Sequence, residues 1–149
     1  MHILVRLYLR TAFVFLALGL LTGLWLEFQM TTGGTISHGM AVAHVHLLLV
    51  GFMVMMIVGT ALWLFPRSGR REPIGPYHNL VAFAYVLLTA GTLLRAATEF
   101  FDEQLVAQMW AYVRLAASTG QVAGILIGIF ALWGRVRGAA IPKVEPPPA

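Results

Sequence analysis

The chain has 149 residues, of which 59% are hydrophobic and 11% are charged, and its mean hydropathy is +0.81. This charged share is less than half of the share found in soluble proteins, so we expect the chain to reside in a membrane. It contains no cysteine, which excludes disulfides, zinc–thiolate sites, iron–sulfur clusters, c-type heme attachment and thiol catalysis. It also contains no phosphate loop and no nucleic-acid patch, so we expect no nucleic-acid partner.

Four apolar stretches are long enough to cross about 30 Å of hydrocarbon as helices. They are Leu7 to Phe28, Met40 to Phe65, Leu80 to Thr98, and Val113 to Trp133. We therefore predict an all-α, multi-pass membrane protein of the cell membrane, with one four-helix domain over residues 1–134 in contact with the lipid bilayer. The Pro-rich segment 135–149 is predicted to be a flexible cytoplasmic tail.

The basic residues predict the orientation of this domain. Eight of the ten lie before the first stretch, after the second or after the fourth. The positive-inside rule then places both termini in the cytoplasm and the other two connections outside. The net charge of +4 follows from this distribution.

Small residues recur every four positions in two of the stretches. Glycines 19 and 23 do so in the first, and Ala116, Gly120, Gly124 and Gly128 do so in the fourth. This spacing is typical of close helix packing, within one chain or between copies.

His44 and His46 lie at the predicted outer end of the second stretch, in the segment AVAHVHLLLVG. At about 100° per residue their side chains point roughly 200° apart, so we expect them to face two different neighbours. Gly51, Met55 and Gly59 follow on the face of His44, where they leave space for a large flat group or for a close helix. A bulkier surface of Val50, Met53 and Ile57 follows on the face of His46.

The segment AHVHLLLVGFMVMMIVGTALWLFP, residues 43–66, resembles the heme-ligating helix of the catalytic subunit of heme–copper oxidases and nitric oxide reductases. In that family a His-x-His pair opens the helix, glycines follow, and the helix ends at a Trp/Phe-Pro corner, as Gly59, Trp63 and Pro66 do here. The resemblance implies that His44 and His46 are axial ligands of a heme b. It also implies electron transfer, with an electron-transfer partner, or binding of a small gas such as NO or O₂.

The catalytic subunits of that family consist of about twelve helices in three similar arcs of four, and this chain corresponds to one arc. Because His44 and His46 diverge, we expect copies of the chain to share each heme. The favoured assembly is a homotrimeric ring with one heme at each interface. The sequence lacks the family's His-His dyad and has no acidic residue or lysine deep in a span. We therefore do not expect a complete oxidase or reductase.

Arg95 and Arg114 lie near the predicted outer rim and require anionic partners. Heme propionates are one possibility, and ordinary ion pairs are the other, since Glu99 lies four residues after Arg95. Gln121, two turns into the fourth helix, is a candidate contact for a ligand or for another helix.

The remaining histidines are weaker candidates. His38 is placed in the outer loop as a second axial ligand, His78 is an interfacial or capping residue, and His2 is a disordered or surface residue. Two other functions remain open from the residues alone. One is a copper or zinc site formed by His38, Met40, His44 and His46, and the other is a structural or assembly subunit of a respiratory complex.

Overall fold

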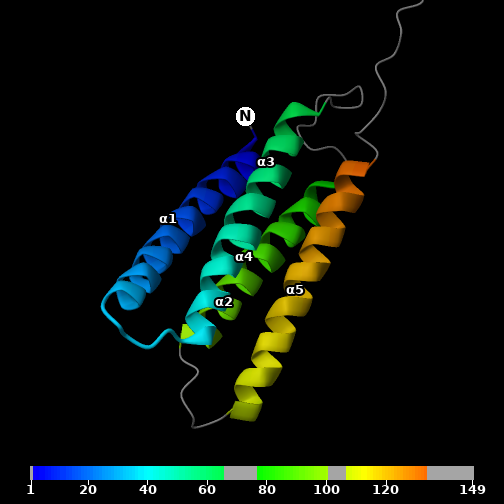
Figure 1. Ribbon diagram of the computed structural model, residues 1–149. Helices are drawn as coiled ribbons and strands as arrows, with labels where there is room; N and C mark the ends of the chain where they lie inside the picture. Colours follow the sequence, from blue (N-terminus) through cyan, green and yellow to red (C-terminus); the bar gives the residue numbers. More distant parts are fainter. Residues whose placement is uncertain (1, 66–76, 101–106, 134–149) are drawn as a thin grey trace, which may run out of the picture.

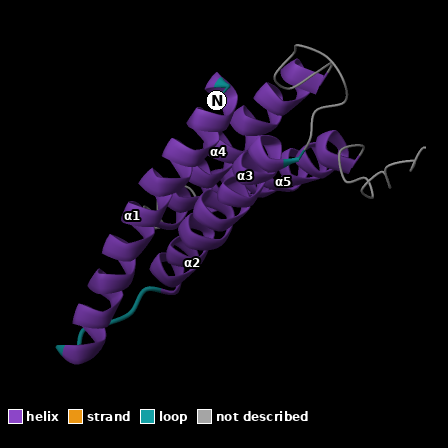
Figure 2. Ribbon diagram, turned by 90° about the horizontal axis from the view of Figure 1, so that it is seen from above, coloured by secondary structure: helices purple, strands orange, loops and turns teal. Residues whose placement is uncertain are grey.

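The structure is a computed structural model that describes residues 2–65, 77–100 and 107–133. The described residues form helices, joined by one short loop, and contain no strand (Figure 2). These helices form four rods, and each rod is long and apolar enough to span a membrane. They are Ile3–Thr31, His38–Leu64, His78–Phe100 and Gln108–Trp133, with mean hydropathy values of 1.9, 2.4, 1.8 and 1.8. The four predicted stretches are therefore confirmed as long apolar helices, each extended by a few residues at one or both ends.

Helix α1, Ile3–Thr31, has a defined signal at each end. The Nδ1 atom of His2 accepts a hydrogen bond from the N–H of Leu4 at 3.2 Å, which satisfies one of the first N–H groups of the helix. At the other end Gly33 has φ +73°, and the N–H of Gly34 donates to the carbonyl of Gln29 at 2.8 Å. A glycine in the left-handed region is a common end of an α-helix.

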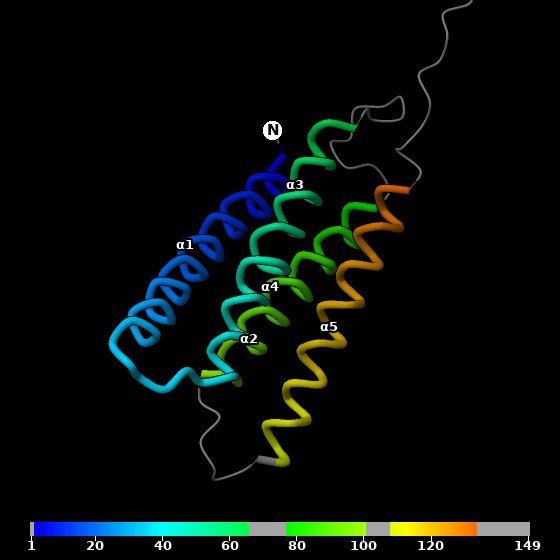
Figure 3. Tube along the Cα trace, in the orientation of Figure 1, coloured from blue at the N-terminus to red at the C-terminus, as the bar shows by residue number. Residues whose placement is uncertain are grey.

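The second span is one continuous rod with three parts (Figure 3). It begins as α2, His38–His46, continues as a π-helical segment, η1, Leu47–Val54, and ends as α3, Met55–Leu64. The final residue before Pro66, Phe65, is extended, as a residue before proline tends to be. The sequence predicted an α-helix throughout, and the π-helical segment directly after His46 is a difference from that prediction.

Helix α4, His78–Phe100, and helix α5, Ala107–Trp133, pack extensively against each other. Glycines permit this approach: a Cβ atom at Gly91 would lie 2.9 Å from the carbonyl oxygen of Ala117 in α5. Likewise, a Cβ at Gly124 would lie 3.2 Å from the carbonyl oxygen of Ala84 in α4. The predicted packing role of Gly124 is confirmed, whereas Ala116 on the same stripe is exposed.

Helix α1 packs along the rod α2–η1–α3, and α4 contacts both of these rods from behind (Figure 1). The core between them contains Tyr8, Phe15, Met55 and Leu88, all almost fully buried. The start of α1, the end of α3 and the end of α5 lie at one end of the bundle (Figure 1). The two histidines lie toward the opposite end, which we call the His-pair end.

Candidate functional site

His44 and His46 face opposite sides of α2. The Nδ1 atom of His44 lies 2.8 Å from the carbonyl oxygen of Gly19 in α1. The ring of His46 instead has its polar neighbours on the other side, in α4 and α5, where they are Arg95, Glu99 and Gln121. The predicted divergence of the two imidazoles is therefore confirmed.

The contact with Gly19 determines which nitrogen of His44 carries the proton. A carbonyl oxygen only accepts hydrogen bonds, so Nδ1 is the donor, and in the neutral form of the imidazole Nε2 then keeps its lone pair. Gly23, one turn further along α1, provides the room for the ring, because a Cβ atom there would lie 2.7 Å from Cε1 of His44. Metal-ligating histidines in proteins are commonly oriented by such a bond from the second nitrogen.

An apolar groove of about 360 Å³ lies beside His44, between α1 and the first part of the second rod. Besides His44 it is lined by Leu16, Leu20, Val45, Leu48, Leu49, Phe52 and Met53. Several of these side chains, including Leu20 and Leu49, are more than half exposed. The groove is thus a surface feature that opens toward lipid or toward a neighbouring protein.

The residues that were expected to line a ligand on the face of His44 have a different role. The space beside Gly51 is filled by Phe15 of α1, whose ring atoms would lie 2.6–2.9 Å from a Cβ at that position. Met55 is completely buried in the core. The sequence left two alternatives for this face, a large flat group or a close helix, and the structure shows a close helix, α1. Met53, expected below His46, lines the groove of His44 instead, because π-helical turns contain more residues than α-helical ones.

His46 belongs to a polar cluster between α2, α4 and α5. Its Nδ1 atom is buried and has no hydrogen-bond partner among the described residues. The buried amide of Gln121 donates to the hydroxyl of Thr92 at 3.2 Å, and both residues are at most 3% exposed. Thr92 was missed in the sequence, although its position seven residues before Glu99 places it on the same face of α4.

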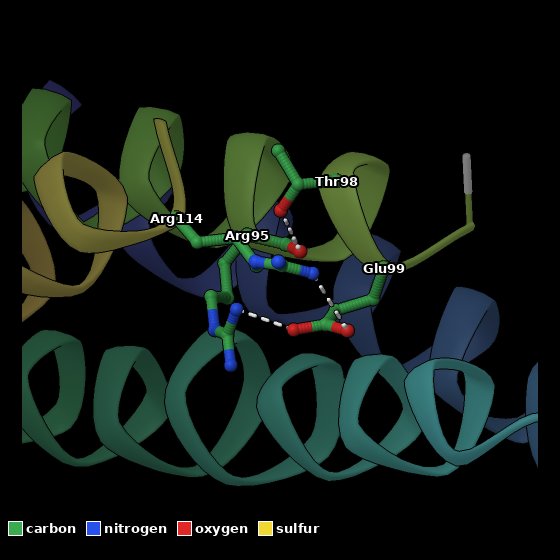
Figure 4. A network of polar contacts seen from close by, with 4 residues as sticks. All are labelled: Arg95, Thr98, Glu99 and Arg114. Atoms are coloured by element: carbon green, nitrogen blue, oxygen red, sulfur yellow. Dashed lines mark hydrogen bonds and ion pairs between the residues drawn. The ribbon is translucent and has the colours of Figure 1, made fainter. Parts of the chain in front are cut away.

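Arg95 and Arg114 share one carboxylate (Figure 4). Glu99 forms an ion pair with Arg95 within α4, and its second oxygen lies 3.9 Å from the guanidinium of Arg114 in α5. The carboxylate is only 7% exposed, against 17% and 25% for the two arginines. The ion-pair interpretation of both arginines is thereby confirmed.

A cavity of about 500 Å³ opens next to this ion-pair network. It is formed by the start of α2, including Ser37, His38 and Val42, together with Arg95 and Glu99 of α4 and Arg114 and Ser118 of α5. We call it the rim cavity. It lies on the opposite side of α2 from the groove beside His44.

His38 is the first residue of α2 and is exposed at the edge of the rim cavity. Its prediction as a loop residue was wrong. The described residues contain no group of three or more histidine, cysteine, aspartate or glutamate side chains that could hold a metal ion. The copper or zinc site that the sequence left open as an alternative, with His38, Met40, His44 and His46 as ligands, therefore does not form within one chain. The reason is that His44 faces α1 and His46 faces α4.

The two remaining histidines meet at the other end of the bundle. The rings of His2 and His78 lie edge to face, with centroids 5.3 Å apart. His2, predicted to be disordered or simply at the surface, is instead the N-cap of α1. The predicted tail over residues 135–149 and the predicted basic and acidic connections over residues 66–73 and 101–104 lie outside the described residues, apart from the acidic residue Glu99.

Comparison with known proteins identifies no relative of the chain. No protein-family model, curated protein or solved structure matches the chain.

Proposed function

We propose that the chain is a membrane protein that binds heme b, with Nε2 of His44 as an axial ligand. One observation carries the proposal. His44 lines an apolar groove and donates from Nδ1 to the carbonyl of Gly19 at 2.8 Å, which in the neutral ring leaves the lone pair of Nε2 for a metal. A bound heme supplies an iron that accepts and releases one electron and that binds small gases when a coordination position is open.

The residues that line the groove fit a heme. Neutral imidazole is a common axial ligand of heme iron, and an apolar lining suits the faces of a porphyrin. The groove is shallow and open, so a planar ligand bound there needs a second surface to cover it. The resemblance of residues 43–66 to the heme-ligating helix of heme–copper oxidases is a second, independent support.

The covering surface in this proposal is another copy of the chain. His46 lies on the opposite side of α2 from His44, and a neighbouring copy related by a ring axis would place that side of α2 toward the open groove. To reach the iron there, His46 must turn out of the cluster in which its neighbours are Arg95, Glu99 and Gln121. In such a ring the arginines near His46, Arg95 and Arg114, come from the neighbour too. Both already pair with Glu99, so propionates bound there would share these guanidinium groups with that carboxylate. We propose a homotrimer, following the three arcs of the family that the chain resembles.

We further propose that the His-pair end faces outward and that both termini lie in the cytoplasm of the cell. The basis is the charge distribution, because Arg6 and Arg10 lie at the opposite end of the bundle from His44. In this orientation the heme lies near the outer face of the membrane. The function is then electron transfer with an external or membrane partner, or binding of a small gas.

An absorption spectrum of the purified protein in its oxidised, reduced and CO-treated forms tests the proposal. We expect a Soret band, together with iron and non-covalent porphyrin in the preparation. The His44→Ala variant should lose the heme, and His46→Ala should retain less heme or convert six-coordinate iron to five-coordinate iron that binds CO. His78→Ala is the matched control and should keep the full spectrum. A colourless preparation after expression with sufficient heme, or an unchanged spectrum in His44→Ala, would overturn the proposal.

A further inference from the structure

We propose that Gln121 and Thr92 hold the ring of His46 inside its own chain, and that they thereby regulate how often the sixth coordination position of the heme is open to a small gas. The inference rests on the proposed function. It adds two positioning residues to that function, and it gives a reason why the protein can bind a gas although two histidines are available to each heme.

The first observation is the contact that His46 makes within one chain. Gln121 of α5 forms a side-chain hydrogen bond with the imidazole. The Nδ1 atom of the same ring is buried and has no hydrogen-bond partner among the described residues, so the contact with Gln121 is made by the other ring nitrogen, Nε2. Because His46 must leave this position to reach the iron of a neighbouring copy, Gln121 competes with that iron for the side chain.

Thr92 fixes the orientation of the Gln121 amide. The amide nitrogen donates to the hydroxyl of Thr92 at 3.2 Å, and neither side chain is more than 3% exposed. With its nitrogen directed at Thr92, the amide has its oxygen available to accept a hydrogen bond from the imidazole. His46 then carries its proton on Nε2, which is the opposite tautomer to that of His44.

Two opposing effects act on His46 in this cluster. The hydrogen bond to Gln121 favours the position, whereas the buried Nδ1 atom has lost its contact with water without gaining a partner, which disfavours it. His46 is also only partly buried, so its ring has a way out of the cluster. A change of one hydrogen bond is therefore sufficient to alter the populations of the two positions.

The two positions of His46 have different consequences for a gas. While His46 lies in the cluster, an iron bound by His44 of the neighbouring copy has an open sixth position. Once His46 has bound that iron, a gas must displace it. This exchange breaks one iron–nitrogen bond and forms one bond to the gas, without transfer of an electron or a proton. Gln121 and Thr92 thus favour the gas-binding form.

The experiment compares variants of the full-length, heme-loaded protein by absorption spectroscopy before and after addition of CO. Gln121→Leu should raise the ratio of six- to five-coordinate heme about fivefold, as expected for the loss of one hydrogen bond, and should weaken CO binding. Thr92→Val removes the partner of the amide and should raise the same ratio about twofold. Thr92→Ser keeps the hydroxyl and should stay close to the wild-type ratio. Gln108→Leu is the matched control, because Gln108 is exposed near the start of α5.

Removal of His46 separates this competition from a general loss of structure. In the heme that His46→Ala retains, the added change Gln121→Leu should leave CO binding unaltered, because the competing ligand is gone. A measurement without heme covers a variant that retains none. In heme-free protein, the ¹⁵N NMR signals of His46 should show the proton on Nε2 in the wild type and both tautomers in Gln121→Leu.

Failure of this inference is distinguishable from failure of the proposed function. A wild-type protein that binds no heme overturns both. If His44 binds heme, the inference alone is overturned by an unchanged coordination ratio in Gln121→Leu, by an equal change in Gln108→Leu, or by a His46 tautomer that does not depend on Gln121.

Discussion

At the scale of single residues, the position of His44 depends on two glycines of α1, which have no side chain to block the imidazole. Gly19 provides a carbonyl oxygen at hydrogen-bonding distance, and Gly23 leaves the volume that the imidazole occupies. Neither glycine is required by an unusual backbone conformation, since both lie inside the α-helix. Their role in the site is to let a side chain of the neighbouring helix reach the backbone of α1.

We therefore predict that Gly23→Val removes the heme without removing the fold. A Cβ atom at position 23 would lie 2.7 Å from Cε1 of the His44 ring, so the ring must move and its bond to Gly19 is lost. The Soret absorbance per protein should fall by at least tenfold, while helical circular dichroism stays constant. Gly120→Ala is the control, because the nearest atom to its Cβ position is 3.9 Å away. Full heme retention in Gly23→Val would contradict the assigned role of His44.

Glu99 is the second residue with a local consequence, because it is the shared carboxylate of two arginines. We predict that Glu99→Gln destabilises the protein by on the order of 2 kcal/mol. This lies below the roughly 3–5 kcal/mol of a fully buried pair, since both arginines are partly exposed. Denaturant titration in detergent, followed by tryptophan fluorescence, measures the change. Glu27→Gln, an exposed position of α1 near the same end, should change the stability by less than about 0.5 kcal/mol.

The residue-scale predictions from the sequence separate into two kinds. The rotation of about 100° per residue was sufficient to predict that His44 and His46 diverge. The four-residue spacing made Glu99 one of the two partners expected for Arg95, beside heme propionates. The carbonyl of Gly19 and the hydroxyl of Thr92 could not be predicted as partners. Each belongs to a different helix from the group it binds, and the sequence does not contain the rotation and height at which two helices meet.

At the scale of elements, contact between helices is concentrated in pairs. The rod α2–η1–α3 lies along α1, whereas α5 packs mainly on α4. The α4–α5 contact brings backbone close to backbone at Gly91 and Gly124. In a lipid environment such contacts rely on dispersion and shape more than on the hydrophobic effect, so added atoms at these positions should have a large effect.

We predict that Gly91→Val destabilises the α4–α5 pair by about 1–3 kcal/mol, the usual cost of overpacking. Its Cβ atom would meet the carbonyl oxygen of Ala117 at 2.9 Å. This oxygen belongs to the backbone of α5, so it cannot move aside as the end of a flexible side chain can. Thermal unfolding of the variant in detergent is the measurement, and Gly120→Ala again serves as the control. Equal melting temperatures in the two variants would show that α4 and α5 are not held in this contact.

Element positions were the part of the fold that the sequence predicted best. Runs of about 20 apolar residues bounded by charge or proline admit one structure in a bilayer, since only a helix satisfies its own backbone there. The π-helical segment was not predicted, because hydrophobicity is nearly uniform over Leu47–Val54 and carries no periodic signal. For the same reason Met53 was assigned to the wrong side of the rod.

At the scale of the whole molecule, the exposed surface is largely apolar. Large hydrophobic side chains are exposed along all four spans, among them Leu24, Trp63, Val86 and Leu126. A protein with such a surface contacts lipid or further protein over most of its circumference. The groove beside His44 is part of this surface.

We predict a heme-containing homotrimer in which each heme is bound by His44 of one copy and His46 of the next. Native mass spectrometry in mild detergent should show three chains and three hemes. In the His46→Ala variant the mass should shift toward smaller assemblies that carry fewer hemes, because His46 is one of the two ligands that join neighbouring copies at each heme. A monomer that retains one heme, or a dimer with a single heme, is incompatible with a shared-ligand ring.

The π-helical segment has one more consequence, which concerns insertion and deletion. A helix bonded five residues apart holds more residues per turn than an α-helix, so η1 accommodates surplus chain without changing the directions of α2 and α3. Removing one residue there, such as the exposed Leu49, allows the segment to approach α-helical geometry, and His44 and Gly59 can both still face α1. A one-residue deletion within α3 cannot be absorbed in this way, because an α-helix holds no surplus residue in its turns. It would turn every following residue by about 100° and move Gly59 away from Tyr8. The length of this protein is therefore adjustable at one place in its second span, directly beneath the two histidines.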